Sequence, residues 1–155
     1  MNNYETLQQI CADHKVPVWE ANMKAHDGLY MDGCIQINST LGTSAEKACI
    51  LAEEYGHHLT AVGDITGTDP WSEKQELQGR RYAYLTLCPI EKIADLILNK
   101  KLLSWNELAE ELNVTEQFLK DAVHEYVNIY GPYVILENGS LFYLDPLGAF
   151  YTIAD

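Results

Sequence analysis

The spacing of apolar residues along the chain alternates between helical and strand-like patterns. Residues 4–14 carry apolar side chains three and four positions apart, which predicts an amphipathic first helix. A short β-prone segment follows at 16–20, and the apolar positions of 28–38 alternate on both sides of Asp32-Gly33. That dipeptide supplies the positive φ angles of a tight turn, so the sequence predicts a β-hairpin there.

The segment 45–59 is predicted to form the next helix, with Ser44 as its N-terminal cap and Lys47 at the position where a capping box has an acid. At about 100° per residue, one side of this helix is apolar, while Glu53 and His57 point nearly opposite to it. The apolar face is expected to pack on the core. That face comprises Ala48, Leu51, Ala52, Tyr55 and Leu59.

Turn-forming residues separate this helix from the next one. Residues 60–72 contain two glycines and a proline, and they are expected to form a loop. Ser72 then begins a second long helix that runs to about Cys88. Pro89, at a first helical position, begins a further short helix.

Two more helices and a pair of strands complete the predicted fold. The segments 104–113 and 115–131 are opened by Ser104 and Thr115, residue types that cap helices. The C-terminal part has two β-prone runs on either side of E-N-G-S, which predicts a terminal hairpin. Because helices and hairpins are segregated along the chain, the predicted class is α+β.

Length and composition indicate one globular domain. The 155 residues are 47% hydrophobic and 21% charged, and no apolar run approaches the roughly 18 residues of a membrane span. The first residues lack the basic and apolar regions of a secretory signal. The four cysteines are widely separated and form no C-x-x-C pair, which is typical of reduced thiols. The cytoplasm is the expected compartment, and no membrane partner is expected.

The net charge of −13 argues against direct binding to nucleic acid. Residues 104–126 have the apolar spacing of a helix-turn-helix, but they carry six acidic side chains against Lys120 alone. A recognition helix of this charge would repel phosphates. These helices are therefore expected to be structural or to contact another protein.

Acidic and histidine side chains cluster near the end of the predicted helix 45–59. A catalytic zinc site needs three protein ligands, an open position for water and a base beside that water. In the H-E-x-x-H motif the two ligands lie four positions apart on one helix face, and the glutamate after the first ligand is the base. The sequence E-E-Y-G-H-H fits this spacing, with Glu53 and His57 as ligands and Glu54 as the base.

A second register of the same segment pairs Glu54 with His58. It places Tyr55 where the base should stand and turns His58 toward the apolar face of the helix. The register of Glu53 and His57 is therefore chemically better. Within it, His58 is expected to pack, to support the ligands through a hydrogen bond, or to act as an alternative ligand.

The third ligand is expected from a second helix packed across the first. Glu76 lies nineteen residues after His57 on the predicted second helix, and Gly79 and Ala83 share roughly its face. Small residues there let two helices approach closely. Arg80, one turn after Glu76, can orient its carboxylate or the substrate, or form a surface ion pair. The fallback candidates for the third ligand are Glu73, Asp64 and Asp69.

Longer stretches around these residues resemble a known family. They include L-A-E-E-Y-G-H-H-L-T-A-V-G-D at 51–64, the hairpin segment 28–38 before it, and K-Q-E-x-x-x-R-R-Y-A-Y-x-x-L at 74–87. The segment S-W-N-E-L-A-E-E-L-N-V-T-E-Q-F-L at 104–119 is similar too, so the resemblance spans nearly the whole chain. The family is that of the ImmA/IrrE-type metallopeptidases, in particular the branch carried by prophages and other mobile elements.

This resemblance implies a zincin, in which a helix with the two-ligand motif and a downstream glutamate bind zinc. By position, His57 matches the second ligand, Glu54 the catalytic base and Glu76 the third ligand. Glu53 stands where most zincins have the first histidine. The expected domain covers 1–155, with a zincin core at about 1–90 and a helical and hairpin part at about 91–155.

The glutamate at position 53 changes the expected metal chemistry. With two carboxylates and one imidazole, zinc remains the first expectation, and manganese or another divalent ion becomes the alternative. Because of the added negative charge, the metal would lower the pKa of its bound water less than it does in a site with two histidines.

The resemblance also implies a protein substrate. Phage-type members of the family work beside a helix-turn-helix repressor that they cleave or help to inactivate. The expected function is therefore that of a cytoplasmic zinc endopeptidase acting on such a regulatory protein. The alternative is a catalytically weak or inactive binding module that keeps the zincin fold and regulates its partner by contact.

Overall fold

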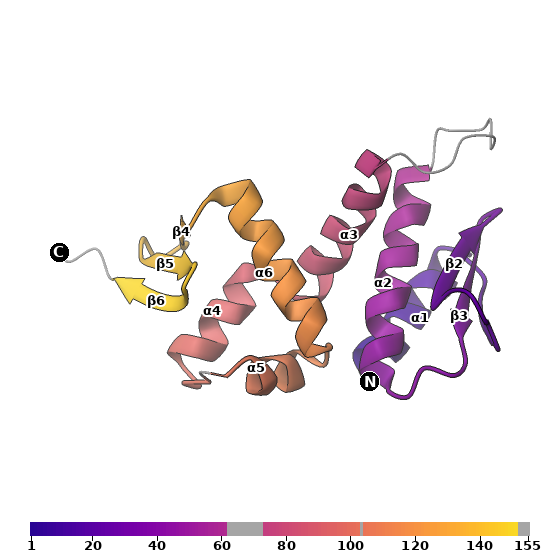
Figure 1. The fold of residues 1–155 in the computed structure, drawn as a ribbon, viewed down its shortest axis with the longest axis horizontal. Helices are drawn as coiled ribbons and strands as arrows, with labels where there is room; N and C mark the ends of the chain where they lie inside the picture. The colour runs from indigo at the N-terminus through magenta and orange to yellow at the C-terminus, as the bar shows by residue number, and fades with distance from the viewer. Residues whose placement is uncertain (62–72, 103, 152–155) are drawn as a thin grey trace.

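The computed structural model describes residues 1–61, 73–102 and 104–151 (Figure 1). The elements are α1 (Asn3–Asp13), β1 (Val18–Ala21), β2 (Gly28–Met31), β3 (Cys34–Asn38), α2 (Ser44–Ala61), α3 (Glu73–Leu87), α4 (Ile90–Leu98), α5 (Trp105–Leu112), α6 (Glu116–Tyr130), β4 (Tyr133–Ile135), β5 (Leu141–Leu144) and β6 (Leu147–Tyr151). One part of the molecule holds α1, the first three strands, α2 and α3, and the other holds the remaining elements (Figure 1). The predicted α+β class is confirmed.

The N-terminal sheet has the strand order β1-β3-β2. The predicted hairpin is confirmed, since β2 and β3 pair antiparallel and Asp32 and Gly33 between them have φ angles of 53° and 78°. The sheet is mixed rather than wholly antiparallel, because β1 pairs parallel to β3. The side chain of Asn38 binds the backbone N–H and carbonyl of Met23, which ties the β1–β2 connection to the end of β3. This order leaves β2 at the edge of the sheet.

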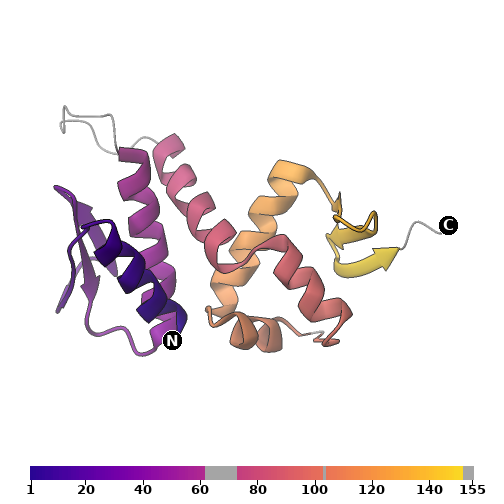
Figure 2. The ribbon, with the colours of Figure 1, turned by 180° about the vertical axis from the view of Figure 1, so that it is seen from behind.

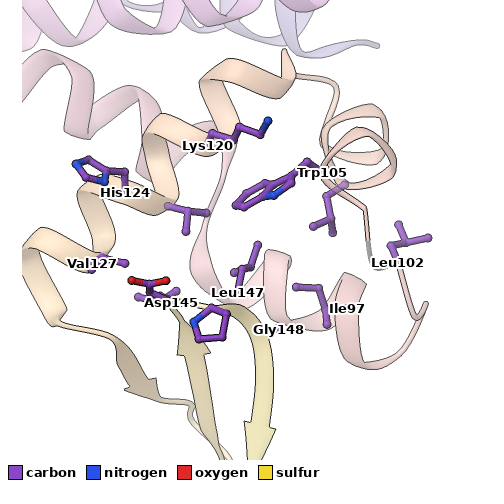
Figure 3. Close-up of a pocket in the computed structure, with 13 residues that line it drawn as sticks. Ile97, Leu102, Trp105, Lys120, His124, Val127, Asp145, Leu147 and Gly148 are labelled. Carbon is purple, nitrogen blue, oxygen red and sulfur yellow. The ribbon is translucent and has the colours of Figure 1, made fainter.

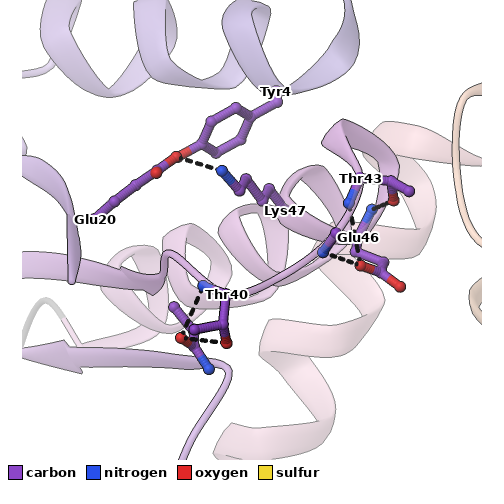
Figure 4. Close-up of polar contacts among 8 residues, drawn as sticks. Tyr4, Glu20, Thr40, Thr43, Glu46 and Lys47 are labelled. Carbon is purple, nitrogen blue, oxygen red and sulfur yellow. Dashed lines mark hydrogen bonds and ion pairs between the residues drawn. The ribbon is translucent and has the colours of Figure 1, made fainter. Parts of the chain in front are cut away.

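Helix α2 begins one residue earlier than predicted and has a different cap. The Thr43 hydroxyl accepts a hydrogen bond from the Glu46 N–H at 3.1 Å, and the Glu46 carboxylate accepts one from the Thr43 N–H at 3.2 Å (Figure 4). This reciprocal pair is a capping box, so the prediction of Ser44 as the cap with Lys47 at the acid position is wrong. Lys47 forms an ion pair of 3.0 Å with Glu20 and so ties α2 to β1.

Helix α2 lies between two layers, with α1 and the sheet on one side and α3 on the other (Figures 1 and 2). Four of the five residues predicted for its apolar face are buried, but Leu59, in its last turn, is 44% exposed. The opposite face is covered by a second helix, as expected for the source of the third ligand. Its residue His57 is only 7% exposed, because α3 packs there.

The contact between α2 and α3 is a crossing of two glycines. A Cβ atom at Gly56 would lie 2.5 Å from the Gly79 carbonyl oxygen, so the two backbones touch directly. Gly79 and Ala83 are buried, as predicted for small residues on this face of α3. A Cβ atom at Gly79 would lie 2.7 Å from His57 Nε2. The missing side chain of Gly79 therefore leaves the space in which the His57 ring lies.

The remaining helices begin close to where the sequence predicts. Pro89 is the N-cap of α4 rather than its first helical residue. The Ser104 and Thr115 hydroxyls accept hydrogen bonds from the N–H groups of Glu107 and Phe118, both at 3.1 Å, which confirms these two caps. Within the described ranges, no helix is long and apolar enough to cross a membrane.

The C-terminal sheet has the strand order β4-β5-β6, with both pairs antiparallel. The predicted terminal hairpin corresponds to β4 and β5. The strand β6 was not predicted, because Pro146 in the turn before it interrupts the alternating pattern. The Tyr126 hydroxyl of α6 donates a buried hydrogen bond of 2.8 Å to the Cys88 carbonyl, which joins α6 to the end of α3.

Candidate metal centre

Helices α2 and α3 bring His57 and Glu76 together beside the glycine crossing. His57 Nε2 lies 3.4 Å from Glu76 Oε2, and His57 Nδ1 lies 3.3 Å from Glu54 Oε2. The imidazole is thus held between a carboxylate of its own helix and one of the neighbouring helix. The side chains of His57 and Glu54 are 9% and 14% exposed, whereas that of Glu76 is 37% exposed. The site is therefore open to solvent on the side of Glu76.

The charges around His57 favour its protonated form. Burial lowers the pKa of the ring, but the hydrogen bond with Glu54 and the charges of Glu54, Glu76 and Glu53 outweigh burial, so the pKa is raised above its usual value. A protonated ring carries an N–H on both nitrogens: Nδ1 makes the hydrogen bond with Glu54, and Nε2 lies at ion-pair distance from Glu76. A metal ion that displaced the proton on Nε2 would meet the same Glu76 carboxylate.

Glu53 is a carboxyl whose surroundings resist its ionisation. Burial raises the pKa of Glu53 to about 7, and the charge of Arg80 on α3 acts against this rise. The carboxylates of Glu54 and Glu76 add to the rise, while His57 lowers the pKa. A carboxylate in such a position is stabilised by a nearby cation.

The separation of His57 Nε2 from Glu76 Oε2 fits one metal ion. Zinc bonds of about 2.0 to 2.2 Å at tetrahedral angles place two ligand atoms about 3.4 Å apart. The two atoms are 3.4 Å apart here, and imidazole nitrogen and carboxylate oxygen are both zinc donors. In the part of the chain that the structure describes, no three His, Cys, Asp or Glu side chains form a complete site. The charges of His57 and Glu76 both act on the Glu53 carboxyl.

His58 contacts the sheet. Its Nδ1 lies 3.1 Å from the Tyr30 hydroxyl on β2, and its ring stacks on that of Tyr55 with the centroids 5.8 Å apart. Tyr55 is buried, as predicted for a packed residue. Of the three roles considered for His58, the structure shows packing between α2 and β2.

The other described candidates, Arg80 and Glu73 on α3, are exposed. The charge of Arg80 acts on Glu53, a partner that was not among the alternatives considered from the sequence, which were Glu76, the substrate and a surface ion pair. Glu73, a fallback third ligand, is exposed in the first turn of α3. The fallback residues Asp64 and Asp69 lie outside the described residues, as does nearly all of the predicted loop 60–72.

Two glycines that were not predicted from the sequence shape the site. Gly28, the first residue of β2, faces Glu54, since a Cβ atom there would lie 3.1 Å from Glu54 Cγ and 3.2 Å from Glu54 Oε1. Gly56 admits the α3 backbone. Its signal in the sequence is its position directly before His57 inside a helix, where glycine costs about 1 kcal/mol relative to alanine and needs a packing reason.

A separate cavity of about 550 Å³ lies in the C-terminal part, where α4, α5 and α6 meet the β5–β6 turn (Figure 3). Its wall is mainly apolar and includes the indole of Trp105. Its charged and titratable lining residues are Lys120, His124 and Asp145. Of the described residues, Glu53, His57 and Glu76 do not line this cavity.

Comparison with known proteins identifies the family of this chain. The sequence profile of the IrrE N-terminal-like domain of the M78 peptidases matches residues 11–124, a range that contains Glu53, Glu54, His57 and Glu76. Searches of curated proteins and of solved structures found no match. The resemblance to the ImmA/IrrE-type family is therefore confirmed over well more than half of the chain. The chain belongs to the IrrE N-terminal-like family of M78 peptidases, whose metallopeptidase chemistry implies a divalent metal, typically zinc.

Proposed function

We propose that this chain is a metal-dependent endopeptidase with its site at the crossing of α2 and α3. The observation that carries the proposal is the 3.4 Å separation of His57 Nε2 and Glu76 Oε2. Two side chains from different helices meet there at the spacing expected of two ligands of one ion. Membership of a peptidase family supports hydrolysis of peptide bonds as the reaction.

The proposed ligands are Glu53, His57 and Glu76, and the proposed ion is Zn²⁺. Two carboxylates beside one imidazole form a harder donor set than two histidines and one carboxylate, so Mn²⁺ is the proposed alternative. When bound, the metal would polarise the scissile carbonyl and activate a water molecule.

Glu54 is the proposed general base. Its Oε2 lies against His57, and its Oε1 lies on the side of Gly28. The carboxylate would take a proton from the attacking water and pass it to the nitrogen of the leaving amine. Proton transfer by a positioned side chain contributes about 10² to 10⁴ in rate.

The proposed substrate is an extended segment of a regulatory protein. Strand β2 is an edge strand, and its first residue, Gly28, lies beside Glu54. An extended peptide that paired with this edge through main-chain hydrogen bonds would pass the base. The resemblance to phage-type members suggests a helix-turn-helix repressor as the protein that is cleaved.

The net charge and the cysteines support a protein partner and a reducing compartment. A net charge of −13 favours a basic protein partner over nucleic acid. The four cysteines are free thiols, three of them buried, which suits a reducing compartment such as the cytoplasm.

The proposal is tested by incubating the zinc-loaded chain with the product of the neighbouring gene, which we expect to be a repressor. We expect a discrete cleavage product that disappears with a chelator and with Glu54→Gln. Glu110→Gln, the same chemical change on the exposed side of α5, is the matched control and should cleave normally. A repressor that stays intact through prolonged incubation with the zinc-loaded chain would refute the proposed activity.

The competing proposal is a binding module that acts by contact. It is favoured by the glutamate at position 53 and by the incomplete metal site among the residues that the structure describes. It predicts a stable complex with the repressor that forms without cleavage and survives Glu54→Gln. Size-exclusion chromatography of the mixture, with and without chelator, separates the two proposals.

A further inference from the structure

His57 can bind a metal through Nε2 only when its ring proton lies on Nδ1. A neutral imidazole has one N–H, and the partner of one nitrogen decides which nitrogen keeps the lone pair. In this structure Nε2 faces Glu76 of α3, and Nδ1 faces Glu54 of α2. A group that accepts a hydrogen bond from Nδ1–H therefore leaves the lone pair on Nε2, where it can bind the metal.

Glu54 is the acceptor on that side. Its Oε2 lies 3.3 Å from His57 Nδ1, and both side chains are largely buried. An ionised acceptor binds an N–H more strongly than a neutral one does, and burial reduces competition from water. A histidine that binds a metal through one nitrogen commonly donates its other N–H to such a carboxylate.

Packing restrains both partners of this hydrogen bond. The edge of the His57 ring that carries Nε2 lies against Gly79, where a Cβ atom would be 2.7 Å from Nε2. On the other side, Glu54 lies against the backbone of β2 at Gly28. The carboxylate and the ring are thus held in contact by the sheet from one direction and by α3 from the other.

We propose that Glu54 is a positioning residue for His57, in addition to its proposed part as the base; this inference rests on the proposed metal site. Through Oε2 it keeps the ring proton on Nδ1 and directs the Nε2 lone pair toward Glu76. A residue that acted only as a base would contact water and substrate, and its loss would leave metal affinity unchanged. Loss of a hydrogen-bond partner of a metal-binding histidine lowers metal affinity by about 10- to 100-fold.

The test measures Zn²⁺ affinity of the metal-free full chain by competition with a chromogenic chelator. Glu54→Ala removes the acceptor, and we expect it to bind Zn²⁺ about 10- to 100-fold more weakly than the wild type. Glu54→Gln keeps a neutral acceptor oxygen for the Nδ1–H, so it should bind Zn²⁺ more tightly than Glu54→Ala and less tightly than the wild type. Glu110→Ala removes an equal charge from an exposed position on α5 and controls for the loss of net charge.

The outcomes separate this inference from the proposed function. Glu54→Ala with wild-type affinity would overturn the positioning role while leaving the metal site intact. Glu54→Gln as weak as Glu54→Ala would also overturn it, because the carboxylate charge rather than the hydrogen bond would then set the affinity. A wild-type chain that binds no Zn²⁺ would reject the metal site itself. If Glu54→Ala does not fold, as judged by circular dichroism, Glu54→Asp withdraws the carboxylate from Nδ1 while keeping its charge, and the same weakening is expected.

Discussion

Replacing Glu53 by glutamine should stabilise the metal-free protein. Glutamine has nearly the shape of glutamate but no ionisable group. Burial raises the pKa of the Glu53 carboxyl to about 7, so at neutral pH and above the folded protein carries a negative charge that its surroundings disfavour. The substitution removes that charge and should remove the associated loss of stability.

The sign and size of the effect follow from the linkage between pKa and folding. The folded state holds the Glu53 proton more tightly than the unfolded chain does, because the pKa rises from its usual 4.5 to about 7. The resulting stabilisation is complete below the unfolded pKa and is lost as the pH rises through the folded pKa. The full change corresponds to about 3 kcal/mol in the free energy of unfolding.

The assay is urea unfolding of the chelator-treated wild type and Glu53→Gln, followed by circular dichroism from about pH 4.5 to about pH 8. The difference in unfolding free energy between the two proteins should grow by about 3 kcal/mol across this range, in favour of the variant. Glu110→Gln, an exposed change of the same kind, should follow the wild type. Parallel pH profiles for the wild type and Glu53→Gln would refute the assignment of the charge to a buried Glu53.

The same variant should behave in the opposite way when Zn²⁺ is present. The ionised Glu53 carboxylate is a proposed ligand, so the wild type should gain stability with increasing Zn²⁺ as the ion binds only its folded form. Glu53→Gln offers a neutral amide oxygen and should gain less. If the wild type becomes the more stable protein when Zn²⁺ is added, the ionised Glu53 carboxylate that destabilises the metal-free protein is a group that binds the metal.

The other predictions concern the metal ligands, the base and the crossing. Purified protein should carry about one divalent metal per chain by elemental analysis, and Glu53→Ala, His57→Ala and Glu76→Ala should each lose it; full metal content in one of these variants would remove that residue from the shell. Because the pKa of His57 is raised, its proton should compete with Zn²⁺ to a higher pH than in an ordinary histidine, so calorimetric affinity should rise as the pH increases through that pKa; a flat profile would contradict this. Glu54→Gln should keep the metal and the unfolding midpoint but lose about 10² to 10⁴ in cleavage rate, and unchanged turnover would exclude Glu54 as the base. Gly79→Ala should lower stability by about 1 to 3 kcal/mol and weaken Zn²⁺ binding, because the added methyl meets the His57 ring; wild-type Zn²⁺ affinity in this variant would show that the ring has room to move.

The main contact of the candidate site could be predicted from the sequence because it depends on helical spacing. The four-residue interval from Glu53 to His57 and the small residues after Glu76 were enough to expect two helices meeting at one ion. The structure brings His57 and Glu76 together in this way. The contact of Glu54 with His57 was not predictable, since it depends on side-chain rotamers and on the approach of β2 at Gly28.

In the fold, too, features set by neighbouring residues could be predicted, and features set by tertiary contacts could not. Asp32-Gly33 specifies a tight turn by its own backbone preferences, and the hairpin formed as predicted. Thr43 and its neighbour Ser44 are equally able to cap a helix, and the position of Glu46 decides between them. The parallel pairing of β1 with β3 and the exposure of Leu59 depend on which elements meet in space, and apolar periodicity carries no such information.

The glycine crossing has a consequence for how this fold diverges. Since Gly56 and Gly79 meet through backbone atoms, one methyl group at either position disturbs the neighbourhood of His57. A lineage that kept the fold only as a binding surface would be released from this restriction. Alanine, which favours a helix by about 1 kcal/mol over glycine, would then be expected to spread into both positions. Retention of both glycines in related chains would therefore mark selection for closely apposed helices, whichever residue occupies the place of the first ligand.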